Sequence, residues 1–392
     1  MDFPQRFSNL PEYAFPRLRA LLDHLTPGGE PMAMTIGEPR HQMPAFVGEV
    51  LAATLAGFNR YPPNEGSPEL LAAFSGWLKR RYGVDVAQDR LMVLNGTREG
   101  LFNAAVALSP ETKNGATPVI LTPNPFYQVY AIAALTVGAQ PVYVPATSAT
   151  GHLPDYASLP AELLDRVTIA YLCSPANPQG AVASQDYWAE LLALAEKHDF
   201  RIFADECYSE IYRDAPPPGI LEVAARVGAD PERVVSFHSL SKRSNLPGLR
   251  AGFLAAGPKS ARAIRQLRAY AGAPVPAPIQ AVAAAAWSDE THVAESRALY
   301  QEKYRIADEV FGGLNAYLPP EAGFFLWLPV ADGEEATLKL WQETGLRVLP
   351  GAYLSRDAEG GNPGKGYIRV ALVNNADETR HGLTLLRNCL YT

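Results

Sequence analysis

The stretch VVSFHSLSKRSNLPGLRAGFLAAG, residues 234–257, places a polar segment with Lys242 between two apolar runs. The runs 234–241 and 250–257 have the length and composition of buried β-strands. A lysine at the end of such a strand must be solvated, paired or neutral, because a lone buried charge is costly. Lys242 is therefore either a solvated loop residue or an amine kept neutral so that it can attack a carbonyl carbon.

Apolar runs of strand length recur through the middle of the chain. The sequence predicts strands at 91–96, 118–123, 140–145, 167–175, 201–207, 234–241 and 250–257. Most of these runs are apolar throughout, which is typical of strands buried on both faces of a parallel sheet. Helical patterns such as 186–199 lie between several of them. The sequence thus predicts an α/β fold with a mainly parallel, seven-stranded sheet covered by helices.

The character of the chain changes after Pro278. A helical pattern, a turn at Ser288–Asp289 and a second, longer helical pattern follow, and further strands are predicted at 323–330, 346–351 and 366–373. At 392 residues the chain exceeds one typical core. We therefore expect a large domain over 46–288 and a smaller α+β domain built from 1–45 and 289–392.

The amino-acid composition limits the kinds of binding partner and the cellular compartment that we expect for this protein. A net charge of −7 gives no basic patch for nucleic acid, and no apolar stretch reaches the roughly 20 residues of a membrane span. The N-terminal residues lack the apolar centre of a signal peptide. The three cysteines are too scattered for a disulfide framework or a zinc site. We expect a cytoplasmic protein with no metal, no membrane and no nucleic acid partner.

Polar residues follow several predicted strands, where ligands bind in such sheets. Residues 96–98 (Gly-Thr-Arg) open a helix and form either an anion seat or an ordinary N-cap. Asn177 lies in a proline-stiffened turn, and Tyr127 has a flat face for stacking or for core packing. Asp205 can hold a protonated heterocycle nitrogen, and no histidine lies nearby in sequence to support a metal. With Lys242, this set matches the needs of pyridoxal phosphate.

The segment SLSKRSNLPGLRAGF (239–253) resembles the Ser-x-x-Lys…Arg signature of the class I/II aminotransferases, the fold type I pyridoxal-phosphate enzymes. The similarity runs from YAFPRLRALL (13–22) to GYIRVALV (366–373). NGTREGLF, NPFYQVY, DECYSEIY and FHSLSKRSNLPGLR are most similar to the bacterial N-succinyldiaminopimelate aminotransferases of lysine biosynthesis. The resemblance implies a transaminase that moves an amino group between N-succinyl-LL-2,6-diaminopimelate and 2-oxoglutarate, with glutamate as the partner amino acid.

The resemblance also implies a role for each matched residue. Lys242 would hold the cofactor covalently and move the substrate α-proton, with Asp205 on the pyridine nitrogen and Tyr208 on the phenolate oxygen. The remaining cofactor contacts would come from Gly96, Thr97, Arg98, Tyr127, Asn177, Ser239, Arg250 and, from the partner subunit of a homodimer, the residue equivalent to Tyr61. Gly37, Asn177 and Arg369 would contact the substrate, Arg369 as the clamp on its α-carboxylate.

Two departures from the family leave open which distal group of the substrate fits, and neither touches the cofactor chemistry. SPANPQG (174–180) has Ala176 and Gln179 where the family usually has Gly and Thr, and YAGAPVPAPIQ (270–280) departs from the wording of the succinyl-specific group. Aspartate, LL-diaminopimelate, alanine and aromatic amino acids remain alternative substrates. The fold also hosts β-lyases, decarboxylases, acyl-CoA-condensing synthases and non-catalytic modules. Arg17, Arg19 and Arg40 are our candidates for binding the distal carboxylates.

Overall fold

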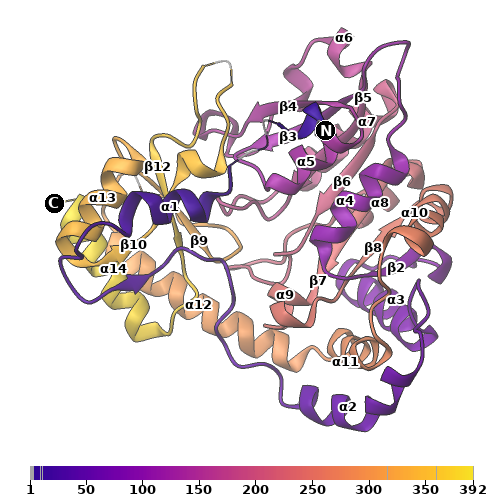
Figure 1. The fold of residues 1–392 in the computed structure, drawn as a ribbon, viewed down its shortest axis with the longest axis horizontal. Helices are drawn as coiled ribbons and strands as arrows, with labels where there is room; N and C mark the ends of the chain where they lie inside the picture. The colour runs from indigo at the N-terminus through magenta and orange to yellow at the C-terminus, as the bar shows by residue number, and fades with distance from the viewer. Residues whose placement is uncertain (1–3, 9, 11, 316, 359, 392) are drawn as a thin grey trace.

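The computed structural model describes residues 4–8, 10, 12–315, 317–358 and 360–391, and its centre is a seven-stranded sheet (Figure 1). The strand order is β2-β8-β7-β6-β5-β3-β4, and β8 alone runs antiparallel to its neighbours in this sheet. The strands are β2 Leu91–Leu94, β3 Val119–Asn124, β4 Gln140–Pro145, β5 Val167–Cys173, β6 Arg201–Asp205, β7 Val234–Ser239 and β8 Gly252–Ala256. The predicted α/β fold and mainly parallel sheet are confirmed.

Both faces of this sheet are buried, which explains the unbroken apolar runs. Successive side chains of a strand point to opposite faces. On β6, Ile202 and Ala204 join one core cluster, whereas Phe203 joins the cluster on the other face. The covering helices are α3 Pro68–Tyr82, α4 Thr97–Leu108, α5 Gln128–Thr136, α6 Ala161–Leu164, α7 Gln185–His198, α8 Ile220–Val227, α10 Pro258–Ala271 and α11 Ala277–Ser288.

A second, smaller layer lies beside this sheet (Figure 1, left). It contains the antiparallel sheet β11-β12-β9 and the parallel pair β1-β10. Its strands are β1 Met32–Ala33, β9 Phe325–Pro329, β10 Leu346–Arg347, β11 Leu349–Pro350 and β12 Tyr367–Ala371, and its helices are α1 Ala14–Leu22, α12 Thr291–Phe311, α13 Gly333–Thr344 and α14 Ala376–Leu390. The N-terminal α1 packs among these C-terminal elements through Leu18, Trp327 and Trp341.

We propose a division into 46–288 and 1–45 with 289–392. α11 contributes Val282 and Trp287 to the core of the large sheet, whereas α12 contributes Tyr304 and Phe311 to the small one. The turn between these helices lies at Asp289, close to the predicted boundary. The boundaries themselves stay a prediction.

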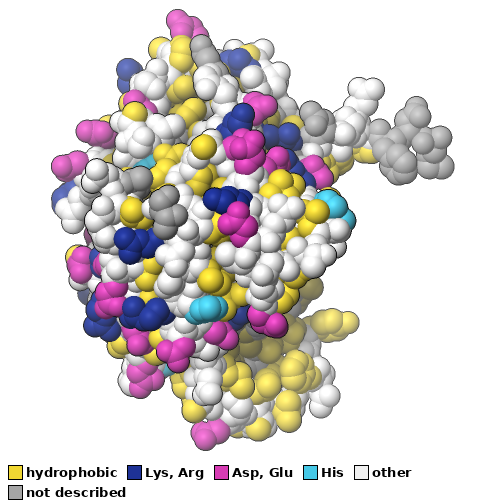
Figure 2. Space-filling view, turned by 90° about the vertical axis from the view of Figure 1, so that its left-hand side faces the viewer, with side chains coloured by type: hydrophobic (Ala, Val, Ile, Leu, Met, Phe, Trp, Pro, Cys, Tyr) yellow, Lys and Arg dark blue, Asp and Glu magenta, His cyan; other side chains and the backbone are white. Residues whose placement is uncertain are grey.

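The distribution of surface charge and the length and polarity of the helices can be compared with the partners that the sequence predicts. On the face that the C-terminal helices form, basic and acidic side chains are interspersed (Figure 2). Across the described part of the chain, every helix is too short or too polar to cross a bilayer. The described residues also contain no cluster of three or more histidine, cysteine or acidic side chains with the geometry of a metal site.

Candidate active site

A cavity of about 480 Å³ opens where the carboxyl ends of the central strands face the small domain. Its polar wall comes from the large sheet, and Phe325 and Arg369 come from β9 and β12. The predicted site residues that line it are Gly37, Thr97, Arg98, Tyr127, Asn177, Asp205, Tyr208, Ser239, Lys242, Arg250 and Arg369. The topology therefore brings together side chains that lie up to 332 positions apart in the sequence.

One end of the cavity is a cationic seat at the N-terminus of α4. Gly96 caps this helix at a φ of 77°, and a Cβ atom there would overlap the guanidinium of Arg250. Arg250 donates to the Asn95 carbonyl at 3.3 Å, while Ser239 accepts from the Ser241 N–H at 3.1 Å. Free N–H groups at a helix start, with a guanidinium beside them, form a site for a phosphate group.

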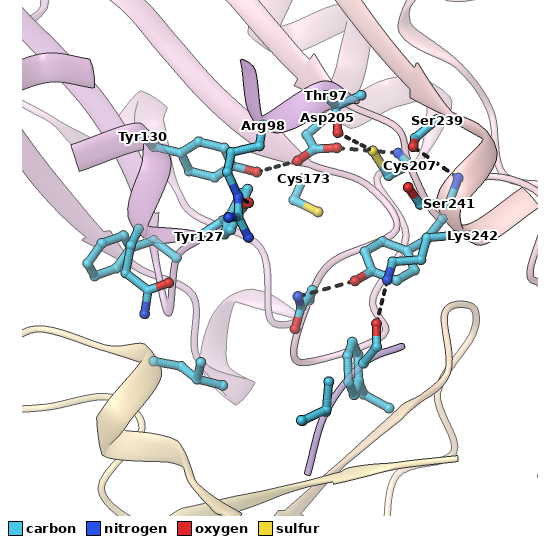
Figure 3. A pocket seen from close by; sticks show the side chains of 18 of the residues that line it. Thr97, Arg98, Tyr127, Tyr130, Cys173, Asp205, Cys207, Ser239, Ser241 and Lys242 are labelled. Carbon is cyan, nitrogen blue, oxygen red and sulfur yellow. Dashed lines mark hydrogen bonds between the residues drawn. The ribbon is translucent and has the colours of Figure 1, made fainter. Parts of the chain in front are cut away.

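Lys242 lies in the middle of the cavity wall (Figure 3). The strand β7 ends at Ser239 rather than at 241, and Ser239 caps a one-turn helix, α9 Leu240–Arg243, that carries Lys242. Its Nζ donates to the Gly37 carbonyl and lies 5.2 Å from the centre of the Phe324 ring. Burial lowers the pKa of Lys242 to about 8. About one amine in ten is therefore neutral at pH 7, as a nucleophile or base requires.

Arg243, which the sequence places next to Lys242, points away from the cavity. Its guanidinium donates to the Ala286 carbonyl at 2.7 Å and pairs with Glu290 at 3.0 Å. The cations that help to lower the pKa of Lys242, after burial, are Arg369 and Arg250. Arg243 therefore does not belong to the cationic surroundings of Lys242, because adjacent residues of a helical turn point in different directions.

Asp205 is buried at the end of β6, on the face that carries Phe203. Its Oδ2 accepts from the Tyr130 hydroxyl at 2.8 Å and its Oδ1 from the Cys207 N–H at 3.4 Å (Figure 3). Burial raises the pKa of Asp205, and these hydrogen bonds oppose that rise. A buried carboxylate without a full counter-charge stabilises a cation that lies against it, such as a pyridinium nitrogen.

Arg369 forms the opposite wall of the cavity. Its Nη1 donates to Asn177 Oδ1 at 3.0 Å and its Nη2 to the Thr35 carbonyl at 2.9 Å, while its Nε has no hydrogen-bond partner. It lies 4.2 Å over the Phe325 ring and, within the described part of the chain, makes no ion pair. Burial lowers the pKa of Arg369 to about 10. A buried guanidinium with neutral partners is a site for a carboxylate.

Two predicted residues lie elsewhere. Gly96 stands behind the cavity wall, next to Arg250. Tyr61 is 99% exposed and does not line the cavity of this chain. Its predicted contact is with the neighbouring subunit, so this role stays a prediction.

The three arginines predicted to bind distal carboxylates do not line the cavity. Arg17 pairs with Glu334 at 3.4 Å and lies 3.8 Å over the Tyr353 ring. Arg40 is exposed and donates to Asn374 at 3.1 Å, and Arg19 is exposed. These three arginines are therefore not part of the lining of this cavity.

The sequence reasoning missed several cavity residues. Tyr130, Cys173, Cys207, Ser241 and Phe325 all line it. Tyr130 lies three positions after Tyr127, the spacing that puts two residues on one side of a helix. Phe325 carried no local signal, since it is one apolar residue of an apolar strand.

Glu206, next to Asp205, points to the opposite face of the sheet. There its Oε2 accepts from the Ser236 hydroxyl at 2.6 Å, and Ser236 lies 2.6 Å from His238 Nε2. Burial raises the pKa of Glu206 from 4.5 to about 7. Protonated Glu206 therefore stabilises the fold fully below pH 4.5, and this contribution is lost as the pH rises through about 7.

Replacing Glu206 with glutamine is expected to raise the free energy of unfolding at pH 8 by about 3 kcal/mol and to change it little at pH 4.5. The amide mimics the protonated acid, because its carbonyl can accept from Ile220 N–H and its NH₂ can donate to Ser236. Urea unfolding of both proteins at the two pH values measures the effect. The exposed Glu295→Gln serves as control, and an equal gain at both pH values would contradict the titration argument.

Comparison with known proteins places this cavity in a family. The profile of the family described as aminotransferase class I and II matches residues 30–384. The chain is 31% identical over 401 residues to an LL-diaminopimelate aminotransferase of Dehalococcoides mccartyi, with 99% of each protein covered. An aminotransferase structure from Neisseria meningitidis has a TM-score of 0.94 at 37% identity, covering 98% of this chain and 99% of that chain. A probable N-succinyldiaminopimelate aminotransferase from Thermus thermophilus has a TM-score of 0.84 at 25% identity, covering 96% and 100%.

The chain belongs to the class I and II aminotransferases. It is a pyridoxal-phosphate-dependent transaminase that acts on amino acids and 2-oxo acids. The cavity fits this cofactor on three points: the anion seat at the N-terminus of α4 with Arg250 beside it, the buried carboxylate of Asp205, and a lysine whose pKa is lowered.

Proposed function

We propose that Lys242 would hold the cofactor covalently and that its amine takes the α-proton of the amino acid substrate. When bound, pyridoxal phosphate supplies an electron-accepting ring that stabilises negative charge at the substrate α-carbon. A lysine with a pKa of about 8 suits a proton transfer near neutral pH, because its two protonation states are both populated there. The Gly37 carbonyl, which accepts from Nζ, aims the amine across the cavity.

The other site residues hold the reacting groups in place. Asp205 would hold the pyridine nitrogen, Tyr127 would stack on the ring, and Asn177 and Tyr208, joined by a 3.3 Å hydrogen bond, would hold the phenolate oxygen. Ser239, Arg250 and the backbone groups of Gly96, Thr97 and Arg98 would hold the phosphate. Arg369 would bind the substrate α-carboxylate, next to Gly37. The observation that carries this proposal is the buried Arg369 without a counter-ion, across one cavity from the buried Lys242.

For the substrate, we infer N-succinyl-LL-2,6-diaminopimelate with 2-oxoglutarate as the amino acceptor, a reaction of lysine and diaminopimelate biosynthesis. The far end of this substrate carries carboxylates and no ammonium group. Among the described residues that line the cavity, Asp205 is the one carboxylate, and it lies at the buried end. Arg98 is a cation at the outer part of the cavity, where its Nε donates to the Tyr127 hydroxyl at 2.5 Å. This charge distribution favours an anionic far end.

LL-diaminopimelate is the second candidate substrate, because curated relatives such as the Dehalococcoides and Desulforudis proteins bear that name at 31% and 32% identity. Its far end carries an ammonium group as well as a carboxylate. A site for it needs a carboxylate that the described cavity residues of one subunit do not supply. The two candidates therefore differ in the charge that the outer cavity must bind.

The test is a half-reaction screen with the purified holoenzyme. Glutamate, N-succinyl-LL-diaminopimelate, LL-diaminopimelate, aspartate, alanine and phenylalanine are added singly, and the change in the cofactor spectrum is followed. We expect the largest kcat/KM for the succinyl substrate, with release of 2-oxoglutarate from glutamate. A larger value for LL-diaminopimelate selects the second candidate, and products of β-elimination instead of 2-oxo acids would contradict transamination.

Replacing Arg98 with glutamine is expected to lower kcat/KM for N-succinyl-LL-diaminopimelate roughly 10- to 100-fold, mainly through KM. The glutamate half-reaction should change less than threefold, because the helix N–H groups of the phosphate seat remain. Measuring both half-reactions tests this split. Arg19→Gln, an exposed arginine outside the cavity, is the control. Equal losses for both substrates would mean that Arg98 acts on the cofactor alone.

We also propose that the enzyme is a cytoplasmic homodimer with shared active sites. Leu55, Phe58 and Tyr61, on and after the segment that extends α2 (Phe46–Thr54), are all more than half exposed. Figure 2 shows hydrophobic side chains gathered at the bottom of the molecule, the end where Figure 1 draws α2. A second copy that covers this surface would also cover the exposed Tyr61, which the resemblance assigns to the phosphate seat of the neighbouring subunit. Sedimentation equilibrium tests the dimer.

A further inference from the structure

Tyr130 is a fully buried residue of α5 whose hydroxyl points at the Asp205 carboxylate (Figure 3). Its ring is stacked on Tyr171, with 4.4 Å between the ring centres and 13° between the planes. Tyr171 in turn donates its hydroxyl to the Leu101 carbonyl at 2.7 Å, inside α4. The Tyr130 hydroxyl is therefore held in place from α5, β5 and α4 at once.

The Tyr130 hydroxyl affects the ionisation of the Asp205 carboxyl group. The titratable groups that act on Asp205 are Tyr127 and Tyr130 beside and on α5, Tyr171 and Cys173 on β5, Cys207 and Tyr208 after β6, and Lys242 on α9. The Tyr130 hydroxyl donates at 2.8 Å and the Cys207 N–H at 3.4 Å. After burial, the hydrogen bonds of the Cys207 side chain and of the Tyr130 hydroxyl, in this order, act most on the pKa of Asp205, and both lower it. Burial raises the pKa of Tyr130 well above its usual range, so its hydroxyl stays protonated near neutral pH.

We propose that Tyr130 is a positioning residue of the transaminase: its hydroxyl orients the Asp205 carboxylate toward the cavity and favours the ionised form that pairs with a pyridinium nitrogen. The inference rests on the proposed role of Asp205. A hydrogen bond to the charged form of a carboxyl group favours that form, while burial opposes it. Without the Tyr130 hydroxyl, the effect of burial on the pKa of Asp205 is opposed less, so Asp205 takes up a proton at a higher pH.

The consequence can be measured without turnover. Cofactor affinity depends on an ionised Asp205, so it falls as the pH falls through the pKa of this group in the cofactor-free protein. Tyr130→Phe keeps the stacked ring and removes the hydroxyl. The affinity for pyridoxal phosphate falls as the solution becomes more acidic, and we call this decrease the acid fall. We expect its midpoint to move up by about one pH unit, so that the affinity of the variant below the midpoint is about tenfold lower than that of wild type. Above pH 8 the affinity should change less than threefold.

The experiment titrates cofactor-free protein with pyridoxal phosphate between pH 5 and 9 and follows the binding by fluorescence. Tyr171→Phe is the matched control, because it also removes a buried tyrosine hydroxyl from the stacked pair but not the bond to Asp205. Tyr130→Met is a second variant without the hydroxyl, in case the first folds poorly. Asp205→Asn tests the basis of the inference, since it should remove the part of the acid fall that depends on Asp205 and leave the part that depends on Lys242 and the phosphate group.

The outcomes separate the inference from its premise. A midpoint that moves to higher pH in both Tyr130 variants, while the midpoint of Tyr171→Phe stays at the wild-type pH, supports the positioning role. Wild-type midpoints in the Tyr130 variants, with a smaller acid fall in Asp205→Asn, overturn the role of Tyr130 and leave that of Asp205 intact. An acid fall of wild-type size and midpoint in Asp205→Asn overturns both.

Discussion

Replacing Lys242 with alanine is expected to abolish transamination, lowering kcat by at least about 10⁴-fold. The variant loses both the amine that carries the cofactor and the base that moves the α-proton. No second lysine lines the cavity among the described residues, so no neighbouring amine can take over. The phosphate seat around Gly96 and Arg250 remains, and we expect cofactor binding to weaken while staying measurable by equilibrium dialysis.

The attachment point of the cofactor can be tested directly. Borohydride reduction of the wild-type holoenzyme should fix the cofactor on one peptide that contains Lys242, as identified by mass spectrometry. Lys259→Ala, an exposed lysine at the start of α10, should show wild-type labelling and activity. A labelled lysine other than Lys242, or full activity in Lys242→Ala, would overturn the assignment.

The sequence predicted the sheet because its signals are local. Each strand of the large sheet is a short apolar run, buried on both faces, that stops at a polar residue, as β6 does at Asp205 and β7 at Ser239. Parallel strands put their carboxyl ends at one edge, so the residues that follow them were expected to meet there. The resemblance to the aminotransferases supplied Arg369, which lies on a strand of the small domain.

The direction in which a side chain points is decided by tertiary packing, and there the sequence was a weaker guide. Arg40 is only three residues after Gly37 yet turns to Asn374, and Arg17 packs on Tyr353 of the small domain. Tyr130 was missed because a tyrosine in an apolar helix is usually a core residue. Its contact with Asp205 joins positions 75 residues apart, which no local pattern reveals.

Asp205→Ala is the variant that separates catalysis from cofactor retention. Its carboxylate faces the pyridine nitrogen in our proposal, and removing it takes away the charge that keeps this nitrogen protonated while negative charge builds up at the substrate α-carbon. We expect kcat to fall roughly 10³-fold, which corresponds to about 4 kcal/mol in the barrier. The cofactor dissociation constant should rise far less, because the phosphate seat and Lys242 are unchanged.

The thermal stability of the Asp205→Ala variant serves as an internal control for its loss of activity. Burial raises the pKa of Asp205, so the ionised group does not stabilise the fold at neutral pH, and its removal should leave the unfolding temperature within a few degrees of wild type. Steady-state kinetics, cofactor titration and thermal unfolding are therefore measured on the same preparation. Activity lost in proportion to bound cofactor would make Asp205 a binding residue, and unchanged kcat would make it structural. A large loss of kcat with the fold retained and a much smaller loss of cofactor affinity is the result that the buried geometry of Asp205 leads us to expect, because the carboxylate then contributes more to the reacting ring than to its attachment.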